Sequence, residues 1–393
     1  MTKNLKIVIA FIIFSLQIYA QEENKDFYVT KGKGYEFHFF DDAYLLQLDF
    51  RGQFRASFPY NGFPVDVSDF DEERANFGIN RARIKIGGYV NKPYFTYYFE
   101  QDIRNFNLLD FRAQFEKYDY FKVRIGQWKA RYSRERIISS GKQTGLERSL
   151  INRPFTIDRQ QGLSFYGNLD GGGAANMSYW VSAFTGMGRG GTTNDDNSLM
   201  YMTRLQWNPN GKDLGFSGSD LKYHDKFISS LAIAGVTNTS RYTRFSTSGG
   251  GQLYGYEPGV DGQYKIDQFL IESAFKYRGL SWQQEFHYKN IDDKINFEET
   301  TLLGNYIQLG YFFHHIIPGV PKQFEVFARH SYYDPNNDIK DNNNYEYTVG
   351  LNWFFKGHRN KLTFDYSYLD YNEFISSHET GNRFRLQWDV SIF

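Results

Sequence analysis

The sequence contains no cysteine, few prolines and, beyond its first twenty residues, no long apolar run. The absence of cysteine excludes disulfides, and it also excludes a lipid anchor at the end of an export signal. Roughly 18 consecutive apolar residues are needed for a membrane-spanning helix. No such run follows Ala20, and the mean hydropathy is −0.59. The sequence therefore excludes a helical membrane architecture for the mature chain.

The chain also lacks an excess of charge of either sign. Its 45 Lys and Arg residues balance 45 Asp and Glu residues, which gives a formal net charge of zero. This neutrality argues against a general nucleic-acid binder, and no DNA- or RNA-binding motif is present. No nucleic-acid partner is expected.

The first twenty residues have the pattern of a secretory signal peptide. Lys3 and Lys6 precede the apolar run "IVIAFIIFSLQIYA", which ends in the small residue Ala20. We predict that residues 1–20 direct export through the inner membrane and are removed after Ala20. A retained membrane anchor is the alternative. Residues 21–42 follow without clean alternation, and we interpret them as a periplasmic tail.

Aromatic residues are what the chain has in abundance. They make up 19% of it, mostly as 38 Phe and 31 Tyr, together with 36 Gly. This composition is typical of β-structure with aromatic girdles at a membrane interface.

The apolar residues alternate with polar ones. In "YLLQLDFRGQFRASF", Leu46, Leu48 and Phe50 share one face, while Asp49 and Arg51 lie on the other. Successive side chains of a strand point to opposite faces, so the segment is an amphipathic strand long enough to cross a membrane. "INRARIKIGGYV", "YEYTVGLNWFF" and "RFRLQWDV" repeat the pattern.

About sixteen such strands are expected, near residues 44–58, 78–91, 93–104, 109–118, 121–130, 159–169, 174–186, 199–208, 225–238, 262–277, 280–290, 301–314, 322–333, 344–356, 359–371 and 382–393. Short turns and long connections alternate between most of them, as in outer-membrane barrels. We therefore predict an all-β fold, a transmembrane antiparallel β-barrel over residues 43–393. A soluble β-sandwich or a chain of several β-domains is the alternative.

If the apolar faces meet lipid, basic side chains of the early strands line the lumen. These candidate approach residues are Arg51, Arg55, Arg81, Arg83 and Lys85. Alternatively, they pair with lumen carboxylates on the next strands, from Glu100, Asp102, Asp110 and Glu116, and both arrangements can hold together.

The third outer connection, residues 131–158, is long and basic. It and its flanks carry Lys129, Arg131, Arg134, Arg136, Lys142, Arg148, Arg153 and Arg159. On an open surface salt would screen most of this charge. Folded into a narrow lumen with low-dielectric walls, the same charges would concentrate anions.

Three segments carry a resemblance to a known family. "KVRIGQWKARYSRE" (Lys122 to Glu135), "LERSLIN" (Leu146 to Asn152) and "DRQQGLSFYG" (Asp158 to Gly167) resemble the phosphate-selective porin O and P family. The resemblance implies a sixteen-stranded outer-membrane barrel, typically a homotrimer, whose third loop folds into the pore. One departure is Lys129-Ala130-Arg131-Tyr132, where many relatives have Lys-Ala-Pro-Phe.

By that resemblance, loop side chains would form the constriction and bind solute. The candidates are Lys129, Arg131, Arg134, Arg136, Ser139, Ser140 and Arg148. The expected function is passive diffusion of small anions, such as phosphate, through a bacterial outer membrane. A general, weakly selective porin and a surface-recognition or adhesin barrel are the alternatives.

The chain is not expected to be an enzyme. Its eight histidines are scattered, and no nucleophile elbow, HExxH motif or phosphate-cradling glycine loop is present. The oxygen-rich stretch "DPNNDIKDNNN" lacks the EF-hand pattern, so no metal or cofactor is expected. Expected partners are small anions, outer-membrane lipid, further copies of the chain and the barrel-assembly machinery, which the resemblance implies would read the terminal Phe393.

Overall fold

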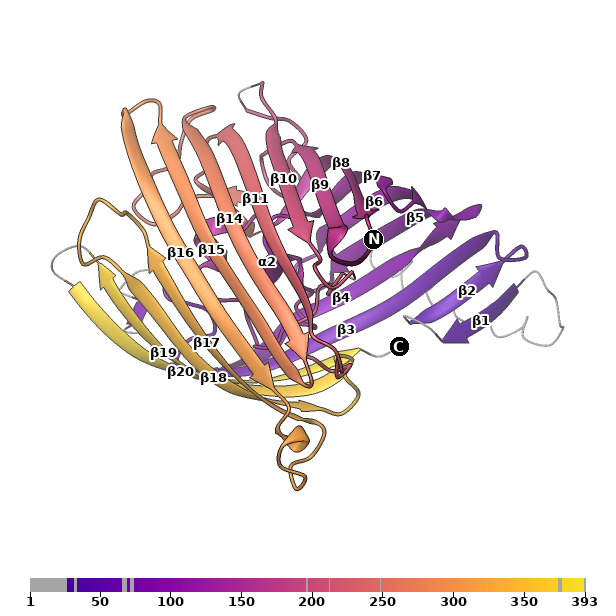
Figure 1. Cartoon of the computed structure of the whole chain (residues 1–393). Coiled ribbons are helices and arrows are strands. Elements are labelled where there is room, and N and C mark those ends of the chain that lie inside the picture. Colours follow the sequence, from indigo (N-terminus) through magenta and orange to yellow (C-terminus); the bar gives the residue numbers. More distant parts are fainter. Residues whose placement is uncertain are drawn as a thin grey trace, which may run out of the picture.

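A single antiparallel sheet closes on itself to form a barrel (Figure 1). The computed structural model describes residues 27–31, 34–65, 69–70, 74–195, 197–211, 213–247, 249–373 and 377–391. Within these residues, β3 to β11 and β14 to β20 make up the barrel's sixteen strands. The predicted fold class is confirmed. The predicted signal peptide and Phe393 lie outside the described residues.

The strands agree closely with the predicted ranges. Those of the barrel are β3 (Tyr44–Phe58), β4 (Asn76–Val90), β5 (Lys92–Asp102), β6 (Asn107–Tyr118), β7 (Phe121–Lys129), β8 (Arg159–Asp170), β9 (Asn176–Phe184), β10 (Met200–Trp207), β11 (Ile228–Ser240), β14 (Tyr264–Tyr277), β15 (Leu280–Asp293), β16 (Glu298–Tyr311), β17 (Phe324–Asp334), β18 (Asn344–Phe354), β19 (Asn360–Glu373) and β20 (Ser377–Ser391). A separate small hairpin joins β12 (Arg244–Thr247) to β13 (Gly249–Gly251).

Closure depends on pairing between the first and last barrel strands. Trp388 of β20 lies opposite Phe54 of β3, and Gln387 lies opposite Arg55. In hydrocarbon an unpaired backbone N–H or C=O finds no water, so a spanning sheet must leave no open edge. The pairing of β20 with β3 meets that requirement.

The side-chain pattern is the reverse of that of a soluble protein. On β20, Phe384, Leu386 and Trp388 are exposed on the outer surface, whereas Arg383 and Arg385 are buried on the inner one. Buried guanidinium groups need partners, and Arg385 donates to Asp365 of β19 at 2.6 and 2.8 Å. The apolar faces therefore point outward, where they would meet lipid, and the polar faces line the interior, as the alternation predicts.

A β-bulge in β4 changes which side chains face inward. Gln53 pairs with Arg81 and Phe54 with Ile79, so Asn80 has no opposite residue. The odd-numbered residues Phe77 and Ile79, before the bulge, are exposed on the outer surface. Arg81, the next odd-numbered residue, follows the bulge and points inward to Glu147. The bulge thereby turns the basic stretch of β4 toward the interior.

The predicted tail 21–42 contains a hairpin. β1 (Phe27–Lys31) pairs with β2 (Tyr35–Phe39), and β2 pairs with residues 44–48 of β3. β20 pairs with the rest of the same β3 edge, from Arg51 to Phe58. The hairpin thus extends the sheet along the part of β3 that β20 does not cover.

Helices are few and short. In the described residues the named ones are α2 (Arg134–Ile137), α3 (Asn152–Phe155) and the 3-10 turns η2 (Gly173–Ala175) and η3 (Phe313–His315). None in the described part of the chain has the length and apolar character needed to cross a bilayer.

We predict that Leu386→Arg destabilises the barrel. Leu386 lies in the middle of the outward apolar series from Phe384 to Val390. A guanidinium there would lie in hydrocarbon and lower the free energy of unfolding by about 2–4 kcal/mol. Denaturant titration of the folded protein in lipid vesicles measures this change.

The matched control is Phe297→Arg, at the tip of the turn between β15 and β16, where the side chain is 90% exposed. An equal loss of stability in both variants would show that the β20 surface does not face lipid.

Candidate functional site

Residues 130–158, hereafter loop 130–158, are anchored to inward-facing carboxylates at their start. Ser133 caps α2 by accepting a hydrogen bond from the Arg136 N–H at 3.2 Å. Its hydroxyl also donates to Glu285 of β15 at 2.8 Å, and the Glu135 N–H donates to the same carboxylate at 2.7 Å. The Arg134 N–H donates to Glu272 of β14 at 3.1 Å. Strands β14 and β15 thus satisfy the exposed donors of this short helix.

The later part of the loop contacts other strands. Glu147 accepts hydrogen bonds from Arg55 of β3 at 2.7 Å and Arg81 of β4 at 2.8 Å. The Leu150 N–H donates to Glu346 of β18 at 2.9 Å, and Lys361 of β19 donates to the Gln143 carbonyl at 2.7 Å. Inward-facing side chains on well-separated strands therefore hold the loop against the inner wall.

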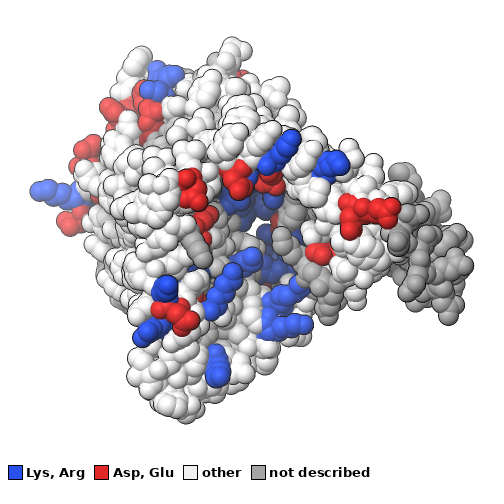
Figure 2. All heavy atoms as spheres, turned by 45° about the vertical axis from the view of Figure 1, so that its right-hand side comes forward, with Lys and Arg blue, Asp and Glu red and all other residues white. Residues whose placement is uncertain are grey.

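A cavity of about 590 Å³ lies between this loop and strands β3 to β8. Its described lining contains ten basic side chains against three acidic ones. The basic residues are Arg51, Arg83, Lys85, Arg112, Arg124, Lys129, Arg131, Lys142, Arg159 and Arg359, and the acidic ones are Asp49, Glu100 and Asp110. Figure 2 shows Lys and Arg side chains gathered around a hollow in one face of the molecule.

Each of the three carboxylates is already engaged by a cation. Arg83 binds Glu100 at 2.7 Å, Lys85 binds Asp49 at 2.8 Å, and Asp110 accepts from Arg159 at 2.6 Å as well as from Arg112. The three negative charges of the lining therefore balance only a minority of its ten positive charges.

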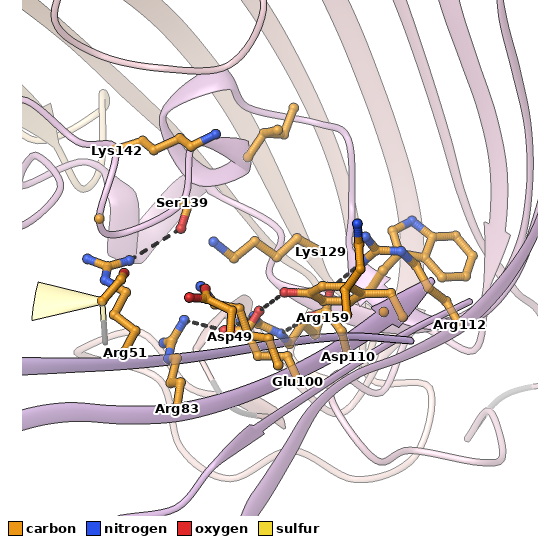
Figure 3. A pocket seen from close by; sticks show the side chains of 18 of the residues that line it. Asp49, Arg51, Arg83, Glu100, Asp110, Arg112, Lys129, Ser139, Lys142 and Arg159 are labelled. Carbon is orange, nitrogen blue, oxygen red and sulfur yellow. Dashed lines mark hydrogen bonds and ion pairs between the residues drawn. The ribbon is translucent and has the colours of Figure 1, made fainter. Parts of the chain in front are cut away.

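Loop and wall side chains meet within this cavity (Figure 3). Ser139 of the loop faces Arg51 of β3, whose guanidinium lies 3.5 Å from the serine hydroxyl. Arg51 also pairs with Asp389 of β20. Lys129, at the end of β7, donates to the Arg136 carbonyl at 3.2 Å and thereby fixes the entry to the loop.

Arg131 is the most distinctive of the loop cations. Its guanidinium lies 5.0 Å from the centre of the Phe216 ring. Burial, followed by repulsion from the Arg124 and Arg112 guanidiniums, lowers the pKa of Arg131 to about 9. Burial is the larger cause, and the repulsion from Arg124 and Arg112 reflects the basic side chains around Arg131.

Half of the twelve predicted site residues line this cavity. They are Arg51, Arg83, Lys85, Lys129, Arg131 and Ser139. The other six are Arg55, Arg81, Arg134, Arg136, Ser140 and Arg148.

Those six lie away from the cavity surface, and five of them are held by protein partners. Arg55 and Arg81 bind Glu147, as described above. Arg134 is fully buried beside Glu272, with Nη1 3.8 Å from the carboxylate, and it donates to the Gly215 carbonyl.

Arg136 pairs with Asp158 at 2.5 Å. Arg148 donates to the carbonyls of Glu135 and Ile138 at 3.0 and 2.9 Å, and it borders a smaller cavity of about 200 Å³. Ser140 is buried within the loop.

Two further wall cations were absent from the predicted site. Arg112 of β6 and Arg124 of β7 line the cavity, and both stack against tyrosine rings. Their neighbours Phe111 and Ile125 are exposed on the outer surface. Adjacent residues of a strand point to opposite faces, so the outward position of these apolar neighbours indicates that the two arginines face inward. Arg159, the first residue of β8, also joins the lining, as do Lys142 of the loop and Arg359 of the turn between β18 and β19. Only the folded loop and turn bring Lys142 and Arg359 there.

Comparison with solved structures shows similarity to outer-membrane channels. An anion-selective porin from Comamonas acidovorans has a TM-score of 0.57 at 12% identity, covering 88% of this chain and 99% of that one. The outer-membrane channel DcaP of Acinetobacter baumannii has a TM-score of 0.58 at 11% identity, covering 90% and 99%. A trimer form of OmpT, an outer-membrane protein from Vibrio cholerae, has a TM-score of 0.52 at 11% identity, covering 88% and 99%.

Sequence comparison gives the family. An uncharacterized protein from Aquifex aeolicus (strain VF5) is 24% identical over 383 residues, which cover 89% of this chain and 84% of that protein. The sequence profile of the phosphate-selective porin O and P family matches residues 50–389, nearly the whole barrel. The chain therefore belongs to the phosphate-selective porin O and P family and is an outer-membrane porin.

Proposed function

We propose that this porin is a passive channel that prefers small anions and that loop 130–158 narrows its pore. The observation that carries the proposal is the charge imbalance of the 590 Å³ cavity, ten basic side chains against three acidic ones. Charges of one sign in a cleft with low-dielectric walls raise the local concentration of counter-ions. Anions would therefore enter the cavity more readily than cations.

The arrangement of the cations suits passage as well as binding. They are spread over five wall strands, the loop and the turn between β18 and β19, so an anion would move between several weak sites. One tight site would block a pore, whereas sites in series allow entry and release. Guanidinium forks match the oxygens of phosphate or carboxylate, which makes phosphate and small organic acids the expected solutes.

The porin family and the barrel fold favour a channel over an enzyme. A weakly selective porin would show little preference between ions, and an adhesin barrel would conduct poorly. Conductance measurements separate these alternatives from the proposal.

The remaining assignments extend the family membership. We propose a homotrimer, by analogy with the trimer form of the similar barrel from Vibrio cholerae. Export by residues 1–20, a periplasmic position for residues 21–42 and insertion by the barrel-assembly machinery remain predictions from the sequence.

Selectivity gives the first test. Bilayer recordings under a potassium chloride gradient should show a reversal potential on the anion-selective side. The double variant Lys129→Gln with Arg131→Gln should move that potential toward zero, because two cavity charges are lost. Lys226→Gln, an exposed residue between β10 and β11, is the control and should leave the potential unchanged. Equal potentials in all three proteins would remove the cavity from the mechanism.

Solute identity gives the second test. Phosphate, pyrophosphate, sulfate and small organic acids should each reduce the chloride current if they occupy the cavity. For phosphate, Arg131→Gln should raise the half-inhibitory concentration by roughly tenfold, the loss expected for one charged hydrogen bond. Chloride currents that none of these anions reduces would identify a weakly selective porin instead.

The position of the loop gives the third test. Glu147→Gln removes the carboxylate that pairs with Arg55 and Arg81, so the loop should detach from β3 and β4 more often. We expect larger conductance fluctuations in single-channel records and faster cleavage of the loop by added protease. Glu379→Gln, exposed on β20, is the matched control. Cleavage at the control's rate would show that this ion-pair cluster does not hold the loop.

A further inference from the structure

A second large cavity, of about 460 Å³, lies on the other side of the loop. It is bordered by the connections that follow β11, β15 and β17, by the end of β19 and by Val65. It therefore lies at the end of the barrel opposite the short turns. Its chemistry contrasts with that of the basic cavity, since no Lys or Arg is among its described lining residues. Small anions have no evident site there.

Five tyrosines line this outer cavity, and they come from four separate parts of the chain. Tyr254 and Tyr256 belong to the connection after β13, Tyr264 begins β14, Tyr333 lies near the end of β17, and Tyr371 lies near the end of β19. Ring contacts hold several of them in place. Tyr256 and Tyr264 meet edge to face at 5.7 Å, and Tyr333 meets Phe155 of the loop in the same way at 5.8 Å.

Amide side chains and the carboxylates of Glu257, Asp293 and Glu298 supply the polar part of the lining. Asn296, Asn336, Asn342, Asn344 and Asn372 all border the cavity. Asn342 is 2% exposed and donates to the Asn336 carbonyl at 3.0 Å. The side-chain oxygens of Asn342 and Asn344 are buried and accept no hydrogen bond from the described residues. Buried acceptors of this kind are costly unless a ligand or water donates to them.

From this combination we infer that the outer cavity is a binding site for sugars. A sugar ring has apolar C–H faces, which pack on tyrosine rings, and a rim of hydroxyls that donate to amide oxygens and accept from amide N–H groups. The cavity volume lies within the range of roughly 300–1,000 Å³ that holds small ligands. One or two sugar rings are the ligands that match its size, its amide and carboxylate acceptors for hydroxyl groups, and its lack of basic residues.

The outer cavity also adjoins a smaller cavity at the surface of the loop. Tyr333, Asn344 and Tyr371 are shared with the smaller 200 Å³ cavity, which is bordered by Arg148 and Arg153 of the loop. A sugar bound in the outer cavity would therefore lie directly above loop 130–158.

Maltose is the probe for the test, with the full barrel reconstituted in a planar bilayer. Maltose should reduce the ion current in a concentration-dependent way, and more strongly than a polyethylene glycol of similar size that has no sugar ring. The double variant Asn342→Ala with Asn344→Ala should raise the half-blocking concentration by roughly fivefold or more, because amide contacts are lost. Asn337→Ala is the control, since Asn337 lies in the same connection, is exposed and does not line the cavity.

Titration calorimetry of the purified protein with maltose gives a readout that does not depend on conduction. Heat of binding in the wild type and in Asn337→Ala, but weaker binding in the double variant, would support the sugar site even if the channel proved unselective for ions. Absence of binding heat in the wild type, or equal affinity in both variants, would overturn it.

Discussion

The structure depends on one constraint, which is that every backbone hydrogen-bonding group in the membrane must be paired within the protein. The pairing of β20 with β3 closes the ring and removes the last open edge. Closure then fixes the direction of every side chain, because alternate residues must point to lipid or to the interior. The apolar residues that a soluble protein would bury, such as Trp388, lie outside, and charged residues such as Arg385 lie inside.

A net charge of zero conceals an uneven distribution of charge within the barrel. Basic residues of β3 to β8 face the cavity, whereas the carboxylates of Glu272, Glu285 and Glu346 lie on β14, β15 and β18. These three carboxylates accept hydrogen bonds from backbone N–H groups and a serine hydroxyl of loop 130–158. These carboxylates thus anchor the loop on one side, and Arg55 and Arg81 anchor it on the other through Glu147. The basic side chains that line the cavity stay at its surface.

The loop also separates two chemically different cavities. The one beside β3 to β8 is basic, and the one beneath the outer connections is lined by tyrosine, asparagine and carboxylate side chains. On the two proposals above, a solute that enters from the outer end of the barrel would meet hydroxyl-binding groups first and guanidinium groups second. A channel built in this way can discriminate between solutes by two independent properties, their hydroxyl pattern and their charge.

The sequence by itself determined the fold, because the alternation of apolar and polar residues along a strand can be recognised from neighbouring residues alone. The same parity, applied to Phe111 and Ile125, would also have placed Arg112 and Arg124 in the interior. The loop has no such period, so its sequence could not show which of its cations face solute. Arg131 and Lys129 line the cavity while Arg134 pairs with Glu272, more than 130 residues away along the chain, and Arg136 pairs with Asp158. Only tertiary structure could decide this, since the partner of a charged loop residue is set by which distant strand the loop meets.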